Sequence, residues 1–196
     1  MQKLFKPKAS LEEYYQQGKS YDFPDLSKTL CPHCKKSRLK KHGFYQRYHI
    51  TVHFCKQIQV RRHYCDSCGR TVSSIPFFCH PRRTYGTEFI MGVLKSFYSK
   101  TQNINQCLEN LIEIERIDCS RQLLYQFRKR FEENLNFLLL EIPNIMSLKE
   151  FLPEKERKER AKQIFSLVHR SDWSPNDVSS RLHSHSGNTY LTQIKV

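Results

Sequence analysis

Four cysteines are the residues in this sequence whose type and spacing are best suited to chemistry. They form two C-x2-C pairs, Cys31 with Cys34 and Cys65 with Cys68, and 30 residues separate the pairs. Two thiolates three positions apart in a tight turn can converge on one metal ion, so two such turns supply the four sulfurs of a tetrahedral site. We therefore predict one structural Zn²⁺ bound by these four residues. Because a four-sulfur site has no open coordination position, we expect no catalytic metal. No nucleophile, base and orienting group can be assembled from the motifs, so we expect no enzyme activity.

Disulfide formation and redox chemistry are less favoured roles for these cysteines. The amino-terminal residues contain no apolar segment typical of a secretion signal, so we expect a bacterial cytoplasmic, nucleoid-associated protein with reduced cysteines rather than disulfides. A redox C-x-x-C motif is disfavoured because no βαβ pattern surrounds either pair. Cys55, Cys79 and His33 are less favourable metal ligands, since four better ones already complete the site.

The charge of the chain indicates an anionic partner. Lys and Arg total 33 against 19 for Asp and Glu, which gives a formal net charge of +14. Between Cys31 and Arg83 twelve basic residues stand against one acid, Asp66. Such a concentration of positive charge is typical of nucleic-acid binding. A mean hydropathy of −0.67 argues against a membrane protein.

The patterning of the chain predicts an α+β protein, a small β-hairpin zinc ribbon followed by a mainly α-helical helix-turn-helix bundle. Within an amino-terminal arm, residues 1–30, the capping-box pattern of Ser10 and Glu13 predicts a short helix to Gln17. The ribbon, residues 31–83, has strand patterns at 38–42, 45–53 and 58–64, and Gly69 suits a turn with positive φ. We expect a helical domain at 84–143, a further helix at 144–170 that packs on the bundle or mediates self-association, and a flexible tail at 171–196.

Three apolar stripes with helical spacing predict helices at 87–100, at 104–112 and from 121 to just before Pro143. A short turn near 116–119 joins the last two, which is the layout of a helix-turn-helix whose second helix enters the major groove of DNA. Its exposed side would contact DNA through Arg121, Gln122, Tyr125, Arg128 and Lys129, with the first two at base edges and Arg128 and Lys129 at phosphates. The ribbon would contact phosphates through Lys35, Lys36, Lys40, Lys41, Arg47, Arg61 and Arg62. A solvated face of an ordinary helical bundle is the alternative for the helix.

The cysteine pairs, the segment from Lys41 to Tyr45, the string RHYCDSCGRTVS from Arg62 to Ser73, and Pro76 together resemble the zinc-ribbon region of bacterial insertion-sequence transposases. Over residues 31 to about 140 the chain looks still more like an uncharacterised bacterial family of stand-alone ribbon-plus-helix proteins. The resemblance implies DNA binding and zinc ligation by Cys31, Cys34, Cys65 and Cys68. It implies nothing catalytic, because only 56 residues follow residue 140, too few for the transposase domain in which three acidic residues hold two metal ions.

The function these observations favour is zinc-dependent binding of double-stranded DNA by an accessory or regulatory protein of a mobile element, with a transposase of that element as a candidate partner. One alternative is a binder of single-stranded nucleic acid or RNA. Another is a protein adaptor that docks a transposase or polymerase through the ribbon.

Overall fold

The computed structural model describes residues 1–100, 103–113, 118–148 and 151–191, except for the side chains of residues 99 and 100. The chain divides into two compact units. Unit 1 comprises residues 1–50 and 54–85, and unit 2 comprises residues 51–53 and 86–196. The α+β class is confirmed, since the described residues form a four-stranded sheet and seven α-helices.

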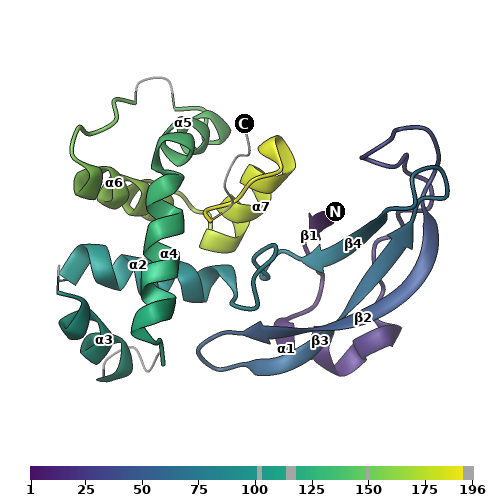
Figure 1. Cartoon of the computed structure of the whole chain (residues 1–196), viewed down its shortest axis with the longest axis horizontal. Coiled ribbons are helices and arrows are strands. Elements are labelled where there is room, and N and C mark those ends of the chain that lie inside the picture. Colours follow the sequence, from purple (N-terminus) through teal and green to yellow (C-terminus); the bar gives the residue numbers. More distant parts are fainter. Residues whose placement is uncertain (101–102, 114–117, 149–150, 192–196) are drawn as a thin grey trace. The chain divides into compact units, whose positions relative to one another are not determined.

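Unit 1 is built on a sheet with the strand order β1-β4-β3-β2 (Figure 1). Its strands are β1 (Gln2–Phe5), β2 (Lys40–Ile50), β3 (Cys55–Tyr64) and β4 (Thr71–Pro76). The long β2–β3 hairpin is antiparallel, β4 pairs antiparallel with β3, and β1 pairs parallel with β4. Gly43, predicted to separate two strands, instead lies at a bulge within the continuous strand β2. The sheet is thus larger than the predicted hairpin by the strands β1 and β4.

The amino-terminal residues form part of this unit. Helix α1 (Leu11–Gln17) begins with the predicted capping box between Ser10 and Glu13 and ends at Gly18. A 3₁₀ turn, Gly18–Ser20, follows. Tyr14 of α1 is fully buried, and its hydroxyl donates a 2.7 Å hydrogen bond to the Gln59 carbonyl of β3. Helix α1 is therefore anchored to the sheet through one aromatic side chain, and β1 completes the sheet edge.

Unit 2 is helical (Figure 1). Its helices are α2 (Thr87–Lys100), α3 (Ile104–Glu113), α4 (Arg121–Glu133), α5 (Leu135–Ile145), α6 (Arg157–Arg170) and α7 (Pro175–Ser186). Helix α2 contacts both α3 and α4, which also contact each other, and it contacts α6 and α7 on other parts of its surface. The helices α2 and α3 match the predicted ranges closely. No helix among the described residues is both long and apolar enough to span a bilayer.

The single helix predicted from 121 to Pro143 is two helices. Asn134 separates α4 from α5, and its buried side-chain amide donates a 3.2 Å hydrogen bond to the Tyr190 carbonyl. This contact with a distant part of the chain explains why no local sequence signal marks the break. Pro143 lies inside α5, in its last turn, where a missing N–H removes only one hydrogen bond.

Residues 175–186 form helix α7, where the composition predicted a flexible tail. Ser174 and Asp177 make a capping box, Pro175 occupies the first turn, and Gly187 ends the helix with φ of +74°. Val178 and Leu182 are fully buried, as is Tyr190 after the helix. The structure therefore differs here from the prediction, because a few well-spaced apolar side chains suffice when other helices already provide a surface.

Candidate metal centre

The four predicted ligands lie together. The sulfur atoms of Cys31, Cys34, Cys65 and Cys68 all lie within 4.8 Å of one another. The Cys31 and Cys68 sulfurs are 3.8 Å apart, and the Cys34 and Cys65 sulfurs are 3.6 Å apart. Cys31 and Cys65 are buried, and Cys34 and Cys68 are half-buried. The four cysteines can therefore hold a metal ion.

The two cysteine turns share the same backbone hydrogen bond and the same backbone conformation at their last residue. In the first turn the Lys35 amide donates to the Cys31 carbonyl, and in the second the Gly69 amide donates to the Cys65 carbonyl, both at 2.9 Å. Each turn ends in the left-handed region, with φ of +56° at Lys35 and +66° at Gly69. The sequence signals this conformation at Gly69 but not at Lys35. Each pair of cysteines thus sits in a turn whose hydrogen bond fixes the spacing of its thiols.

Local hydrogen bonds favour thiolates at two of the cysteines. The Ser37 hydroxyl lies 3.1 Å from the Cys65 sulfur and is the main cause that lowers the pKa of Cys65 to about 6. The backbone N–H of Cys34 lowers the pKa of the Cys31 thiol. At Cys68 the Arg70 N–H lowers the pKa, but burial and the neighbouring thiols raise it more, to about 12. Four crowded thiols cannot all ionise without a compensating cation, which a bound dication supplies.

Apolar side chains pack against the four cysteines. Leu26, Leu39 and Val72 form a buried cluster with the cysteine side chains. Leu26 precedes the first cysteine pair, Leu39 follows it, and Val72 follows the second pair on β4. The four cysteines are thus part of a small core, so a metal ion bound by them would also hold this core together.

The other cysteines lie elsewhere. Cys55 is exposed at the start of β3, and Cys107 and Cys119 are buried in unit 2. Cys79 is buried with its sulfur 3.6 Å from Nδ1 of His49, and burial raises the pKa of this thiol to about 12. His33 is exposed in the first turn. None of these residues belongs to a metal-binding group within the described part of the chain.

Several basic residues lie close in sequence to the four cysteines, and they differ in whether they form ion pairs. Lys40 forms an ion pair with Asp66, and Lys41 lies 3.4 Å from an oxygen of Asp25. By contrast, the exposed side chains of four residues near the two turns make no ion pair in the described chain: Lys35, Lys36, Arg38 and Arg70. Arg38 and Arg70 were not among the predicted phosphate contacts, although their position beside the cysteine pairs gives a sequence signal.

Three predicted phosphate contacts of the sheet do not share one surface. Arg61 lies over the Phe44 ring and Arg62 over the Tyr45 ring, with 4.6 and 5.5 Å from guanidinium carbon to ring centroid. Adjacent strand residues point to opposite faces, so these two cations lie on opposite faces of the sheet. Arg47 donates to the backbone carbonyls of His80 and Arg83. Arg47 is therefore engaged within unit 1.

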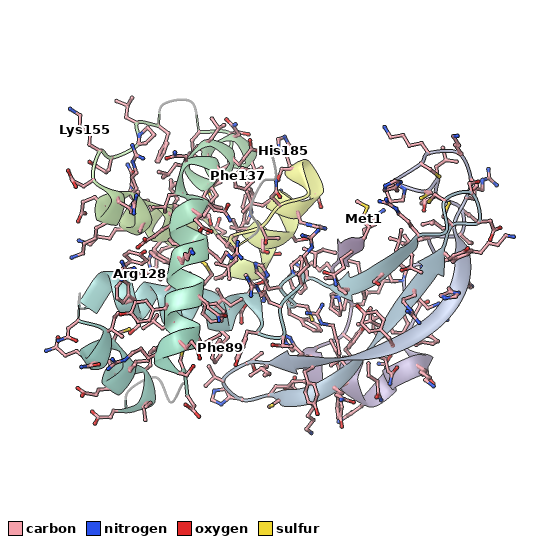
Figure 2. The ribbon with its side chains drawn as sticks, viewed as in Figure 1. Met1, Phe89, Arg128, Phe137, Lys155 and His185 are labelled. Atoms are coloured by element: carbon pink, nitrogen blue, oxygen red, sulfur yellow. The ribbon has the colours of Figure 1, made fainter. Side chains whose placement is uncertain are left out.

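Helix α4 presents most, but not all, of its predicted contact residues to solvent. Arg121, Gln122, Tyr125 and Lys129 are exposed, and Arg121 donates to the Asn105 side chain of α3. Arg128 differs, because its Nε donates to a Glu132 oxygen at 2.8 Å and its guanidinium lies 5.2 Å from the Phe97 ring centroid. Figure 2 marks Arg128 on α4. Residues 116 and 117 of the turn predicted near 116–119 lie outside the described part of the chain.

Comparison with known proteins gives one finding. Residues 31–108 are similar to the family model of a domain of unknown function, DUF6431. The matched segment begins at Cys31, contains the other three cysteines of the cluster and continues through α2 into α3. No curated protein and no solved structure matches the chain.

Proposed function

We propose that this protein is a zinc-dependent binder of double-stranded DNA that acts as an accessory or regulatory protein of a bacterial mobile element. In this proposal the sheet unit holds one structural Zn²⁺ and contacts phosphates, while helix α4 reads the major groove. A transposase of the same element is the expected protein partner, and the reaction itself belongs to that partner.

The sulfur geometry supports zinc. A tetrahedral site with Zn–S bonds of about 2.3 Å places its sulfurs about 3.8 Å apart. The separations of 3.6 and 3.8 Å between paired sulfurs fit this value. Four thiolates and no open position are typical of a structural zinc site, so zinc would hold the two cysteine turns together and perform no reaction.

The exposed face of α4 is the observation that most supports DNA binding. Leu124, Phe127 and Phe131 are buried, so the opposite face of the helix is directed to solvent. That face runs at helical spacing through the exposed residues Arg121, Gln122, Tyr125, Gln126 and Lys129. No acidic residue occurs in this helix before Glu132, so about three turns present only donors, amides and one aromatic ring. Glutamine and arginine pair with the edges of adenine and guanine in the major groove.

The packing around α4 also suits a helix that is presented to DNA. Ser120 caps the helix by accepting a hydrogen bond from the Leu123 amide, which leaves the first turn well ordered. Helix α3 precedes α4 and contacts it, and α2 contacts both. Three helices packed in this way can present the second helix of a helix-turn-helix to DNA. Arg128 is better assigned to this packing than to phosphate contact, because of its bond to Glu132.

The phosphate contacts are best assigned to the cations around the metal centre. Lys35, Lys36, Arg38 and Arg70 would need to break no ion pair of the described chain to bind phosphate, whereas Lys40 and Lys41 would each exchange a carboxylate partner. Placing these contacts beside the cysteine turns makes phosphate binding dependent on zinc.

Fluorescence anisotropy of the zinc-loaded protein on duplex and single-stranded oligonucleotides tests the proposal. We expect tighter binding to duplex, and if six to ten phosphates are neutralised, a loss of about 10³ to 10⁵ in affinity between 50 and 200 mM salt. Chelation of the zinc should weaken binding. Tighter binding to single strands would instead favour the RNA or single-strand alternative, and binding to neither form would favour the adaptor.

Two substitutions on α4 and one control distinguish contacts to base edges from sequence-independent attraction between basic side chains and phosphates. On a duplex selected from a random library, Gln122→Ala should cost about 1–3 kcal/mol and relax specificity, whereas Lys129→Ala should weaken binding to all duplexes and lower the salt slope by about one. Arg170→Ala removes an exposed cation at the end of α6 and should change neither. Equal effects of Gln122→Ala and Arg170→Ala would refute the assignment of α4.

A further inference from the structure

A groove lined by both polar and apolar residues lies in unit 2, between the end of α5 and the start of α6. It has a volume of about 540 Å³. Asn136 and Asn144 line it as polar residues, and Arg160 is the only charged residue among the described residues that line it. Its apolar lining comes from Leu139, Leu140, Pro143, Leu148, Phe151 and Pro153. A volume in this range exceeds what one inserted side chain needs. Leu140 and Leu148 are 63% and 44% exposed, so the groove is open to solvent.

A leucine projects from the same patch. Leu152 is 88% exposed, the highest value among the exposed large apolar side chains of the described chain. Its backbone is nevertheless held firmly, because Gln163 Nε2 donates to the Leu152 carbonyl at 2.9 Å and the Glu154 amide donates to Gln163 Oε1 at 3.0 Å. The Arg160 side chain adds hydrogen bonds to the Glu154 carbonyl and to Asn136. The backbone from Leu152 to Glu154 is therefore held by side chains of α6, while the Leu152 side chain is exposed and does not line the groove.

The charges beside the leucine and the groove are complementary. Glu154 and Glu156 follow Leu152, and their carboxylates make no ion pair in the described chain. Arg160 at the groove has no acidic partner among the described residues either, since its hydrogen bonds go to a carbonyl and an amide oxygen. Figure 2 shows Lys155, between the two glutamates, pointing outward from this loop. A surface that brings another Leu152 into the groove also brings another Glu154 toward Arg160.

We propose that this patch is a homodimer interface in which Leu152 of each copy inserts into the groove of the other. A projecting side chain and a matching recess on one patch are self-complementary, which is the requirement for a twofold symmetric contact. Burying a leucine that is otherwise almost fully exposed supplies the driving force, and a preordered loop lowers the entropic cost of association. The partner is therefore a second copy of this chain.

Sedimentation velocity of the full, metal-loaded chain tests the proposal. The wild-type mass should rise from 23.5 kDa toward twice that value as the concentration is raised to about 100 µM. Leu152→Asp and Leu140→Asp should each weaken dimerisation at least about tenfold. Ile112→Asp is the matched control, because Ile112 is 57% exposed on α3, away from the groove, and it should leave the dimer unchanged.

Mixing the two dimerisation variants tests the exchange of leucines directly. The Leu140→Asp chain keeps its Leu152 and the Leu152→Asp chain keeps its groove, so one of the two contacts can form in a mixture. We expect the mixture to associate more strongly than either variant alone. A wild-type chain that stays monomeric, or an Ile112→Asp variant as impaired as Leu152→Asp, would overturn the proposal. Circular dichroism of each variant shows whether the fold is kept.

Discussion

The two units of this protein are stabilised in different ways. The buried apolar residues of unit 1 fall into three small clusters, one of which includes the four cysteines of the candidate metal centre. In unit 2 fully buried large side chains come from most of the helices, among them Ile90 and Leu94 of α2, Phe127 and Phe131 of α4 and Leu138 of α5. Unit 2 can therefore be stabilised by apolar burial, whereas unit 1 has divided cores, and we expect its stability to depend on a metal ion held by the four cysteines.

Removing the metal should have the largest effect and should affect one unit only. Structural zinc supplies about 10–16 kcal/mol of apparent binding free energy in small domains, as much as the stability of a whole domain. We expect a chelator to unfold unit 1, with new proteolytic cleavage confined to residues 1–85. The single tryptophan of the chain, Trp173, lies in unit 2, so its fluorescence emission should not change.

A matched pair of variants provides the control for metal removal. Cys68→Ser removes a ligand and should reproduce the effect of the chelator, whereas Cys55→Ser alters an exposed cysteine outside the site and should bind the metal normally. If Trp173 emission shifts together with the unfolding of unit 1, the stability of unit 2 also depends on the metal, which contradicts the expected difference between the units.

The converse experiment alters the core of unit 2. Phe127 is 1% exposed, and Phe127→Ala should destabilise unit 2 by about 3–5 kcal/mol through the cavity it leaves. Urea denaturation followed by Trp173 fluorescence measures this loss. Ile112→Ala, an exposed truncation in the same unit, should cost less than about 0.5 kcal/mol. Metal content should stay at one ion per chain in both variants, and loss of the metal from Phe127→Ala would show that the units are coupled.

Acid should destabilise unit 1 through His49 as well as through the thiols. His49 is fully buried, and burial, with a smaller contribution from Arg47, lowers its pKa to about 4. An unfolded histidine titrates near 6.5, so below that pH the unfolded chain binds a proton that the folded chain does not. The contribution of His49 is thus complete above pH 6.5 and falls by up to about 1.4 kcal/mol per pH unit toward pH 4.

A variant isolates the histidine contribution to the pH dependence. His49→Leu cannot take up this proton, so its free energy of unfolding should decrease less steeply than that of the wild type between about pH 6.5 and 5. Chemical denaturation of both metal-loaded proteins at several pH values measures the difference, because the contribution of the thiols is common to both. Parallel pH profiles would show that His49 does not titrate as its burial requires.

The smallest expected effects distinguish the two cysteine turns. Gly69→Ala should destabilise unit 1 by about 1–2 kcal/mol, because a side chain at positive φ is strained even though the added Cβ would meet only Tyr64 Oη at 3.9 Å. Lys35→Gly should stabilise unit 1 slightly, since it relieves the same strain in the other turn. Thermal unfolding of the metal-loaded variants gives the signs. Lys36→Gly, at a position without positive φ, should not stabilise the unit.

Local signals made part of this fold predictable from the sequence. The cysteine spacing, the capping box at Ser10 and the apolar stripe of α2 each act over a few residues, and the structure has the corresponding features at those positions. The missed elements depend on distant partners. Strand β4 has no alternating pattern because Val72 to Pro76 are all buried, and the break at Asn134 depends on a hydrogen bond to Tyr190.

The same distinction applies to the candidate site. The thiol ligands could be predicted because their spacing alone brings them together. Which basic side chains are already engaged in ion pairs or hydrogen bonds could not be predicted. The ion pair of Lys40 with Asp66, the carbonyl bonds of Arg47 and the bond of Arg128 to Glu132 all depend on where partner side chains lie. A count of positive charges therefore locates a basic surface but does not show which charges are available to a ligand.

The parallel pairing of β1 with β4 affects the order in which the molecule forms. Gln2 pairs with Ser73, so these two strands meet across nearly the whole length of unit 1, while the hydrogen bonds of each helix in unit 2 join near neighbours. Contacts between distant residues form slowly because the intervening loop must first close. During synthesis β1 must wait for β4 to be made. After β4 has been made and before β1 docks on it, the open edge of β4 can pair with another chain, so this edge is a point at which the chain can aggregate during folding.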